Sequence, residues 1–340
     1  MLDAEDGTRH AAPSKASLWA LRAALALVPL TVLWPSGRAH IRAASLLSRF
    51  ADGGGHSLIA DISRHPVGER DLDLSRTRAR LYIPIDLHDP PALVVVHGVH
   101  SKGIDEPRLV RFSRAVAASG VAVLTPEVRE LCDYRIDPAS IDTIGSSAAA
   151  LARELRRETV GVMGFSFAGG LALIAASDPR YRAAFAFVVA VGAHDDLGRV
   201  LRFFVSNEAP RPDGTAMRLG AHPYGPAVLM YSHARDFFAP YDVAVASDAL
   251  SLWLREDFDA ARAHSAALSA EGAKQMKHIF DRDTAALAAD LSAEIDRLEP
   301  SFAAVSPSAH LAEIGVPVFL LHGAGDSVIP PTEVEWLASC

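Results

Sequence analysis

Short apolar runs recur along the middle and the end of the chain. They are Leu93–Val96, Val121–Leu124, Val160–Met163, Phe185–Val191 and Val316–Leu321. Each run is almost wholly apolar and largely β-branched, which is typical of strands that are buried on both faces. Strands of this kind belong to a parallel sheet that helices cover. The pattern therefore predicts a mostly parallel β-sheet.

Amphipathic segments lie between these runs. Apolar residues recur at helical spacing in Pro107–Ser119, Pro138–Arg157 and Ala168–Ala176. The resulting βαβα order predicts an α/β domain with a doubly wound sheet. Upstream, Thr77–Ile85 alternates between polar and apolar residues and is followed by the turn signal Asp89-Pro90-Pro91. This stretch indicates an antiparallel strand ahead of the parallel set.

Composition limits the classes of protein that need to be considered. The chain has 340 residues, of which 50% are hydrophobic and 22% are charged, and its mean hydropathy is +0.16. It can bury a large core, which excludes a disordered protein. A formal net charge of -8 argues against a nucleic-acid partner. The two cysteines, Cys132 and Cys340, are too few for a disulfide framework and do not fit a zinc motif. His97 and His100 have a spacing that could hold a metal ion, but no third metal ligand follows them. The sequence predicts no metal and no other cofactor, and it leaves the oligomeric state open.

The N-terminal region contains a hydrophobic segment, Ser17–Trp34, with apolar residues on every side of a helix. Such a helix must be surrounded by protein or lipid. We expect it to be a single membrane anchor, with Trp19 and Trp34 near the two interfaces. A helix packed on the domain or lying in the interface, and a cleaved signal peptide, are the alternatives. The expected localisation is therefore membrane-associated, or cytoplasmic if the helix is packed.

Candidate chemistry is concentrated in the stretch Gly164–Gly170, which reads Gly-Phe-Ser-Phe-Ala-Gly-Gly. A predicted strand ends at Gly164 and a predicted helix begins after Ser166. The serine must therefore occupy a sharp turn with small residues on both sides. The start of the helix supplies backbone N–H groups for a developing oxyanion. The alternative is an incidental serine in a strand-to-helix loop.

This stretch resembles the nucleophile elbow of the α/β-hydrolase family, and also its dienelactone-hydrolase branch, which carries Cys where this chain has Ser166. His97-Gly98-Val99 resembles the oxyanion loop of the family, and Leu321–Pro330 resembles its acid loop. The resemblance implies that Ser166 is the nucleophile, that Asp326 is the triad acid, and that the N–H groups of Val99 and Phe167 form the oxyanion hole.

Other residues offer alternatives to these roles. His97 and His322 lie in loops where the imidazole is expected to brace the backbone rather than act as a base. Asp195 and Asp196 follow a predicted strand, so either could replace Asp326 as the acid. We favour Asp326 because it lies within a complete motif.

Ser166 and Asp326 are 160 residues apart, whereas two helices, two strands and their connections need about 50 residues. The remaining hundred or so, roughly Asp195 to Ala309, are expected to form a helical insertion. Helical spacing occurs in Gly198–Val205, Ala244–Leu254, Ala260–Ala273 and Asp283–Leu298. We expect this insertion to be a cap over the active site. Its aromatic residues either line an acyl pocket or form the core of the cap. They are Phe203, Phe204, Tyr224, Tyr231, Phe237, Phe238 and Tyr241.

The predicted domain organisation has five parts. They are a hydrophobic segment (1–40), a linker region (41–76), the first part of the hydrolase core (77–194), the helical cap (195–309) and the end of the core (310–340). In the family the triad histidine follows the acid after a further helix and strand, but no histidine follows Asp326. We therefore expect the histidine beyond Cys340 and the chain to be truncated. If a histidine of this chain serves as the base, His194 is the first candidate.

The predicted function is that of a serine hydrolase acting on a small-molecule ester or related acyl substrate. The alternative is a non-catalytic relative that keeps the fold for binding or as a scaffold.

Overall fold

The computed structural model describes residues 37, 39–51, 64–74 and 77–339, and it divides into two compact units, Met1–Arg64 and His65–Cys340. In the first unit, residues 39–51 are helical. The predicted anchor Ser17–Trp34 lies outside the described residues. Among the helices of the described part, none combines the length and the apolar character needed to cross a membrane.

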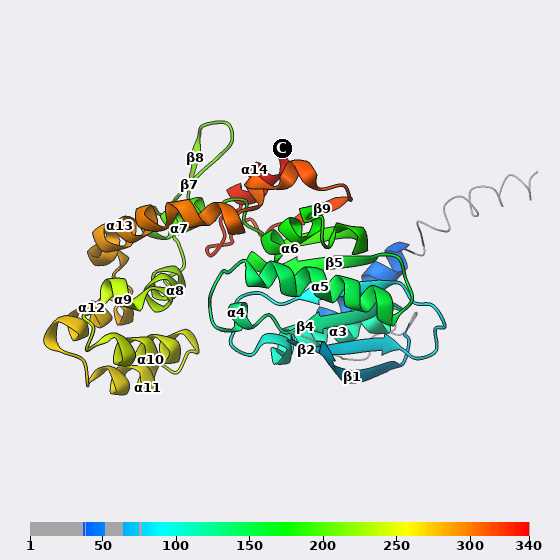
Figure 1. Ribbon diagram of the computed structural model, residues 1–340, viewed down its shortest axis with the longest axis horizontal. Coiled ribbons are helices and arrows are strands. Elements are labelled where there is room, and N and C mark those ends of the chain that lie inside the picture. The colour runs from blue at the N-terminus through cyan, green and yellow to red at the C-terminus, as the bar shows by residue number, and fades with distance from the viewer. Residues whose placement is uncertain (1–36, 38, 52–63, 75–76, 340) are drawn as a thin grey trace, which may run out of the picture. The chain divides into compact units, whose positions relative to one another are not determined.

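The second unit is built on a seven-stranded sheet with the order β1-β2-β4-β3-β5-β6-β9 (Figure 1). Its strands are β1 (Val67–Leu74), β2 (Thr77–Pro84), β3 (Ala92–Val96), β4 (Ala122–Pro126), β5 (Val160–Phe165), β6 (Phe185–Val191) and β9 (Val318–Leu321). The pairs β1–β2 and β2–β4 are antiparallel, and the remaining pairs are parallel. The predicted mostly parallel sheet with an antiparallel leading strand is confirmed, and its order is that of an α/β-hydrolase-like fold.

One part of the predicted domain division is wrong. Strand β1 lies within residues 41–76, which the sequence indicated as a linker, and pairs along its whole length with β2. Its sequence, Val-Gly-Glu-Arg-Asp-Leu-Asp-Leu, is rich in charge because an edge strand is largely exposed. Arg80 on β2 donates a hydrogen bond to Asp71 on β1, so the charged residues contribute to the pairing. A half-exposed edge strand has the composition of a linker, which explains the error.

Helices cover both faces of the sheet. The core helices are α3 (Pro107–Ala118), α4 (Arg129–Cys132), α5 (Ala139–Glu154), α6 (Phe167–Ser177) and α14 (Thr332–Ala338), and two 3-10 turns are η1 (Gly103–Asp105) and η2 (Arg182–Ala184). Helix α3 crosses from β3 to β4 in one direction along the sheet, whereas α5 and α6 cross in the other direction. Because such crossovers are right-handed, α3 covers one face and α5 and α6 cover the other.

Helix α6 is the central helix of the domain. All 11 of its residues are buried, which explains why its sequence is apolar on every side. Its first residue, Phe167, directly follows the serine of the predicted nucleophile turn. The most buried helix therefore begins at the candidate site and holds that site in a fixed position.

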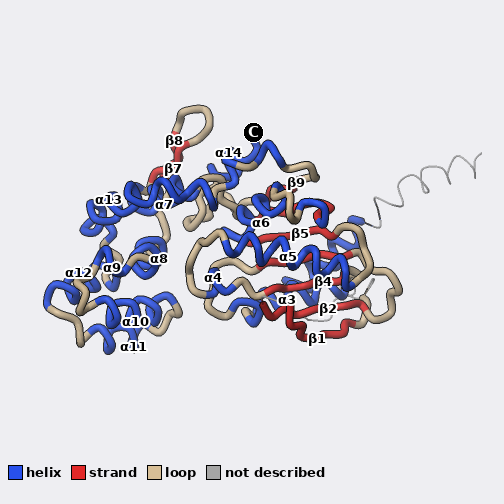
Figure 2. The backbone as a smooth tube through the Cα atoms, viewed as in Figure 1, coloured by secondary structure: helices blue, strands red, loops and turns tan. Residues whose placement is uncertain are grey.

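The insertion is mostly helical, as predicted (Figure 2). It contains α7 (Leu197–Ser206), α8 (Tyr224–Ser232), α9 (Ala234–Phe237), α10 (Val243–Leu254), α11 (Phe258–Ser265), α12 (Ala270–Phe280) and α13 (Thr284–Phe302), the hairpin β7 (Glu208–Pro210) and β8 (Ala216–Arg218), and the 3-10 turns η3 (Ala303–Val305) and η4 (Pro307–Ala309). A further 3-10 turn, η5 (Leu311–Glu313), follows the insertion and precedes β9.

The single helix predicted over Ala260–Ala273 is wrong, because the chain breaks between α11 and α12. Ser269 accepts a hydrogen bond from the backbone N–H of Gly272 and so caps the new helix. The side chain of Asp242 in turn accepts hydrogen bonds from the Ser269 backbone and hydroxyl. These polar contacts start a second helix inside a continuous helical pattern.

Hydrogen bonds join the cap to the core. The Tyr134 hydroxyl donates to the carbonyl oxygen of Leu254 at 2.8 Å, and the Tyr231 hydroxyl donates to Asp133 at 2.7 Å. The backbone N–H of His222 donates to the carbonyl oxygen of Ser327 at 2.8 Å. The third bond fixes the cap segment before α8 against the predicted acid loop.

Candidate active site

Ser166 occupies the strand-to-helix turn that the sequence predicts, between β5 and α6. Its backbone has φ 56° and ψ −136°, a conformation that L-residues other than glycine rarely adopt. Such strain costs about 1–3 kcal/mol, and it persists at sites where the surroundings fix the backbone. Here the Ser166 N–H donates to the carbonyl oxygen of Val191 at 2.7 Å, and the Gly169 N–H donates to the carbonyl oxygen of Ser166 at 2.8 Å.

The turn is too tight for larger residues beside the serine. A Cβ atom on Gly164 would lie 2.4 Å from the carbonyl oxygen of Ala168, and one on Gly169 would lie 2.9 Å from the Cβ of Ala193. Both approaches are shorter than real Cβ contacts. The small residues of the motif are therefore required by the packing of the turn against α6 and the sheet.

The loop after β3 passes directly beside the serine. A Cβ atom on Gly98 would lie 3.2 Å from the Cβ of Ser166. His97 fixes this loop through two hydrogen bonds. Its Nδ1 donates to the Gly98 carbonyl at 2.7 Å, and its Nε2 accepts from the Val128 N–H at 3.0 Å. Burial lowers the pKa of His97, which favours this neutral form. The imidazole is placed as a backbone brace, as the sequence indicated.

Backbone donors are available at this position. Val99 follows Gly98, and Phe167 is the first residue of α6. Within the described residues, neither N–H group has a backbone acceptor. The loop that carries Val99 therefore lies beside Ser166, and Phe167 directly follows Ser166 in the chain.

The predicted acid, Asp326, lies in the loop between β9 and α14. Its Oδ1 accepts hydrogen bonds from the N–H groups of Val328 and Ile329 at 2.9 and 3.1 Å. Its Oδ2 lies 3.2 Å from the position of a Cβ atom on Gly192, which directly follows β6. Since the Ser166 N–H bonds to the carbonyl of Val191, the end of β6 brings the two predicted triad residues to one edge of the sheet.

The alternative acids have structural roles. The Asp195 carboxylate is buried and accepts a hydrogen bond from the Arg199 guanidinium at 2.8 Å. Asp196 caps α7 by accepting from the Arg199 backbone N–H at 2.7 Å. Both carboxylates thus interact with Arg199, in the first turn of α7.

Sequence reasoning missed Glu333, which is fully buried in the first turn of α14. Its carboxylate accepts hydrogen bonds from the backbone N–H groups of Asp195 and Asp196 at 2.8 and 3.0 Å, and from the Arg199 guanidinium. This contact ties the loop after β6 to the helix after the acid loop. A glutamate at a helix N-terminus is too common a feature for the sequence to have signalled this role.

The other histidines at this end of the sheet also brace the backbone. His194 is fully buried, packs against Phe167, and bonds through Nε2 to the Val305 carbonyl at 2.8 Å. Burial lowers its pKa to about 4. His322 bonds through Nε2 to the Ile329 carbonyl at 2.8 Å, and the same atom lies 3.7 Å from Asp326. In the described part of the chain, no histidine hydrogen-bonds to the Ser166 hydroxyl.

A cavity of about 230 Å³ begins at Val99 and extends between the loop after β3 and the cap. Aromatic residues that line it are Tyr134, Tyr224, Trp253 and Phe258. Of the aromatic residues predicted to line a pocket or fill the cap, Phe203, Phe204 and Phe238 are buried in the core, and Tyr241 is 74% exposed. Only Tyr224 from that set lines this cavity.

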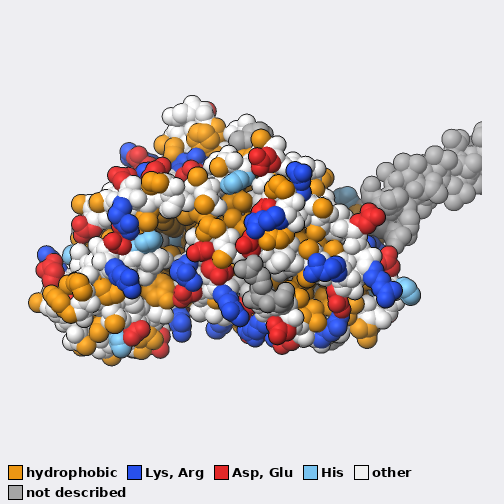
Figure 3. Space-filling view, in the orientation of Figure 1, with side chains coloured by type: hydrophobic (Ala, Val, Ile, Leu, Met, Phe, Trp, Pro, Cys, Tyr) orange, Lys and Arg blue, Asp and Glu red, His pale blue; other side chains and the backbone are white. Residues whose placement is uncertain are grey.

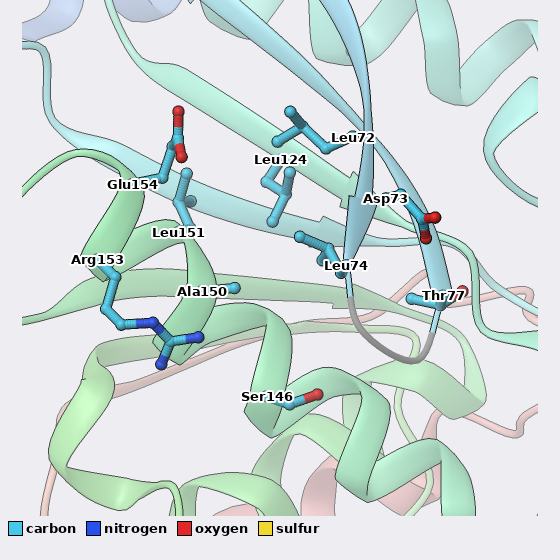
Figure 4. A pocket seen from close by; sticks show the side chains of 10 residues that line it. All are labelled: Leu72, Asp73, Leu74, Thr77, Leu124, Ser146, Ala150, Leu151, Arg153 and Glu154. Carbon is cyan, nitrogen blue, oxygen red and sulfur yellow. The ribbon is translucent and has the colours of Figure 1, made fainter.

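A second cavity, of about 390 Å³, lies between the β1–β2 hairpin and α5 (Figure 4). Its lining is Leu72, Asp73, Leu74, Thr77, Leu124, Ser146, Ala150, Leu151, Arg153 and Glu154. None of these residues belongs to the loops around Ser166 or Asp326. This cavity is therefore separate from the candidate active site.

The described residues contain one group with the spacing of a metal site, formed by His233, Asp236 and Glu294. Arg297 donates two hydrogen bonds to Glu294 and one to Asp236. The guanidinium thus neutralises the carboxylates that would have to bind a cation.

No protein-family model and no curated protein matches the chain. Solved structures do match it. A bacterial membrane phospholipase A is 13% identical with a TM-score of 0.39, and the match covers 95% of this chain and 87% of the other. A dienelactone hydrolase from Anabaena variabilis is 20% identical with a TM-score of 0.33, over 39% and 66% of the two chains. An esterase from Pyrococcus furiosus is 12% identical with a TM-score of 0.41, over 84% and 80%. Likenesses this distant carry no argument about activity, and the fold is established by the strand order of this chain.

Proposed function

We propose that the chain is a serine hydrolase that cleaves a carboxylic ester or related acyl bond of a small molecule, with Ser166 as the nucleophile. The observation that carries the proposal is the left-handed backbone of Ser166 at a tight turn between a buried strand and the most buried helix. Within the described residues its hydroxyl makes no hydrogen bond, so Oγ is free to meet a substrate.

In the proposed mechanism, Ser166 Oγ attacks the substrate carbonyl carbon and forms a tetrahedral intermediate. Negative charge develops on the former carbonyl oxygen. The N–H groups of Val99 and Phe167 stabilise that charge, supported by the positive end of α6. Collapse of the intermediate breaks the bond to the leaving group and leaves an acyl-enzyme, which water then hydrolyses.

The serine proton must pass to a base and from there to the leaving group. We assign Asp326 the role of orienting a histidine that performs this transfer. The described histidines at the sheet edge do not hydrogen-bond to Ser166, so they leave this step without a base. A serine hydroxyl without a base reacts slowly, because only the oxyanion hole and substrate binding then promote the reaction.

Hydrolysis of 4-nitrophenyl acetate by the 340-residue chain tests the proposal. We expect slow turnover that passes through an acyl-enzyme at Ser166, which mass spectrometry of the protein detects, and Ser166→Ala should abolish that acyl-enzyme. Ser308→Ala is the matched control, because Ser308 is exposed in the turn η4 and should leave the rate unchanged. Turnover with no acyl group on Ser166, or equal acylation of the wild type and Ser166→Ala, would contradict the assignment.

A non-catalytic binding protein is the second candidate. The absence of a histidine bonded to Ser166 in the described part of the chain favours it. Under this alternative, no acyl group forms on Ser166 and Ser166→Ala leaves ligand binding unchanged, so the same assay separates the two candidates.

A further inference from the structure

The cavity beside Val99 carries an excess of positive charge at its rim. Lys102, Arg255 and Arg282 line it together with a single carboxylate, that of Glu256. On the face that Figure 3 shows, acidic and basic side chains are interspersed. The positive rim is therefore a local feature of a chain whose net charge is -8.

The three cations come from different parts of the fold. Lys102 lies in the loop after β3, Arg255 directly follows α10, and Arg282 follows α12. Within the described residues none of the three forms an ion pair, whereas many other arginines of the domain do so, such as Arg78 with Asp105. Guanidinium groups without a carboxylate partner, such as those of Arg255 and Arg282 in this lining, are suited to bind a carboxylate or phosphate through paired N–H donors.

A residue of the cavity wall, Tyr224, carries an unused hydrogen-bond donor. The Tyr224 hydroxyl is buried and has no partner in the described part of the structure. Burial raises the pKa of Tyr224 well above its ordinary value, so the phenol keeps its proton. Buried polar groups in proteins are rarely left unpaired, so this O–H group is suited to donate to an oxygen of a bound ligand.

The remaining walls are apolar and aromatic. Trp253 and Phe258 pack edge to face with ring centroids 4.5 Å apart, and Tyr134 and Tyr224 pack with centroids 6.0 Å apart. A volume of about 230 Å³ lies below the range of roughly 300–1,000 Å³ typical of sites for drug-sized ligands. The cavity is therefore suited to a small ligand with an apolar body.

We propose that this cavity binds a small substrate with an apolar body and an anionic group, the anion being held by Lys102, Arg255 and Arg282. The inference rests on the proposed function in one respect, since it takes the bound molecule to be the substrate of Ser166. Val99 lines the cavity and directly follows Gly98, which packs against the Cβ of Ser166, so the cavity begins one residue from the contact with the nucleophile.

Equilibrium binding of a matched ligand pair tests the proposal without requiring catalysis. The probes are 4-phenylbutyrate, which is anionic at pH 7, and the uncharged 4-phenylbutyramide. We expect the wild-type chain at low salt to bind the acid about tenfold or more tightly than the amide, and added salt to reduce the difference. Ser166→Ala should keep this preference, so failure of the proposed nucleophile and failure of the anion site give different results.

Two variants locate the site. Arg255→Gln and Arg282→Gly should each reduce the preference for the acid severalfold and leave the affinity for the amide unchanged. Arg282 has φ 59°, so glycine relieves backbone strain there and the variant should fold. Arg182→Gln is the control, because Arg182 is also exposed and without an ion pair in the described residues, but lies in η2, outside the lining.

Equal affinity for the acid and the amide, or no binding of either probe, would overturn the proposal. So would an equal loss of preference in Arg182→Gln, because the effect would then reflect overall charge rather than the cavity.

Discussion

The Oδ2 atom of Asp326 lies 3.2 Å from the position that a Cβ atom on Gly192 would occupy. Gly192 has φ 62° and directly follows β6, so it combines a left-handed backbone with close approach of the carboxylate. The acid loop is thus seated on a residue that has no side chain.

Gly192→Ala should therefore destabilise the protein in two ways. Backbone strain costs about 1–2 kcal/mol, and the added methyl group displaces the Asp326 carboxylate from its two backbone donors. Gly214→Ala is the matched control, because Gly214 has φ 85° but open space around its Cβ position. We expect the larger loss of unfolding free energy at Gly192. In a chain that already carries Asp326→Ala, Gly192→Ala should reduce the unfolding free energy by less than it does in the wild type. If the losses from the two substitutions simply add in this double-mutant cycle, the contact between the two residues is contradicted.

Glu333→Gln should be strongly destabilising. The substitution removes the buried negative charge that pairs with Arg199. It also turns an amide N–H donor toward the backbone N–H groups of Asp195 or Asp196, which then lack an acceptor. Breaking a buried ion pair of this kind costs about 3–5 kcal/mol. Glu335→Gln on the same helix removes only an exposed contact with Arg211 and should cost less than about 1 kcal/mol. Urea unfolding compares the two variants, and equal midpoints would contradict the role of Glu333.

Stability should fall as the solution is acidified below pH 6.5, partly because of His194. Its folded-state pKa, about 4, is below the ordinary value of 6.5, so the unfolded chain takes up the proton first. The contribution of His194 to the free energy of unfolding is fully present above pH 6.5 and is lost progressively as the pH falls to 4. Between pH 7.5 and pH 5 the loss is about 2 kcal/mol. His194→Gln should flatten this dependence, whereas substitution of the exposed His88 should not. Urea titrations at the two pH values provide the measurement, and an unchanged slope in His194→Gln would disprove the assignment.

The regular parts of this fold could be predicted from sequence because buried strands and amphipathic helices have distinct periodicities. Strand β6 begins and ends where the apolar run does, and Ser166 lies at the predicted turn. Strand β1 was missed because its exposed side chains are charged, and the break before α12 depends on a polar contact with Asp242.

Contacts between distant residues could not be predicted in the same way. Glu333 and Arg199 are 134 residues apart, and the spacing carries no sign of their contact. Likewise, Lys102 and Arg282 reach one cavity only because the cap folds over the loop after β3. The catalytic roles of Ser166, Asp326, Val99 and Phe167 stay predictions, although the structure brings their loops to one edge of the sheet.

For the N-terminal segment we propose membrane association through residues Ser17–Trp34. The full chain should then stay in the membrane fraction after a high-salt wash and require detergent for release. Deletion of residues 1–40 should release the protein without changing its melting temperature. A full chain that is soluble without detergent, together with a lower melting temperature on deletion, would show instead that the segment packs on the globular domain.

The most direct test of the central claim is the site at which a fluorophosphonate probe modifies the intact chain, mapped by peptide mass spectrometry. The account predicts that Ser166 is modified faster than any other serine, because among the serines that the structure describes only Ser166 combines a fixed, strained turn with neighbouring oxyanion donors. Ser166→Ala should abolish this selective modification. Modification spread evenly over the serines, or preferred at another serine, would contradict the assignment of Ser166 as the nucleophile.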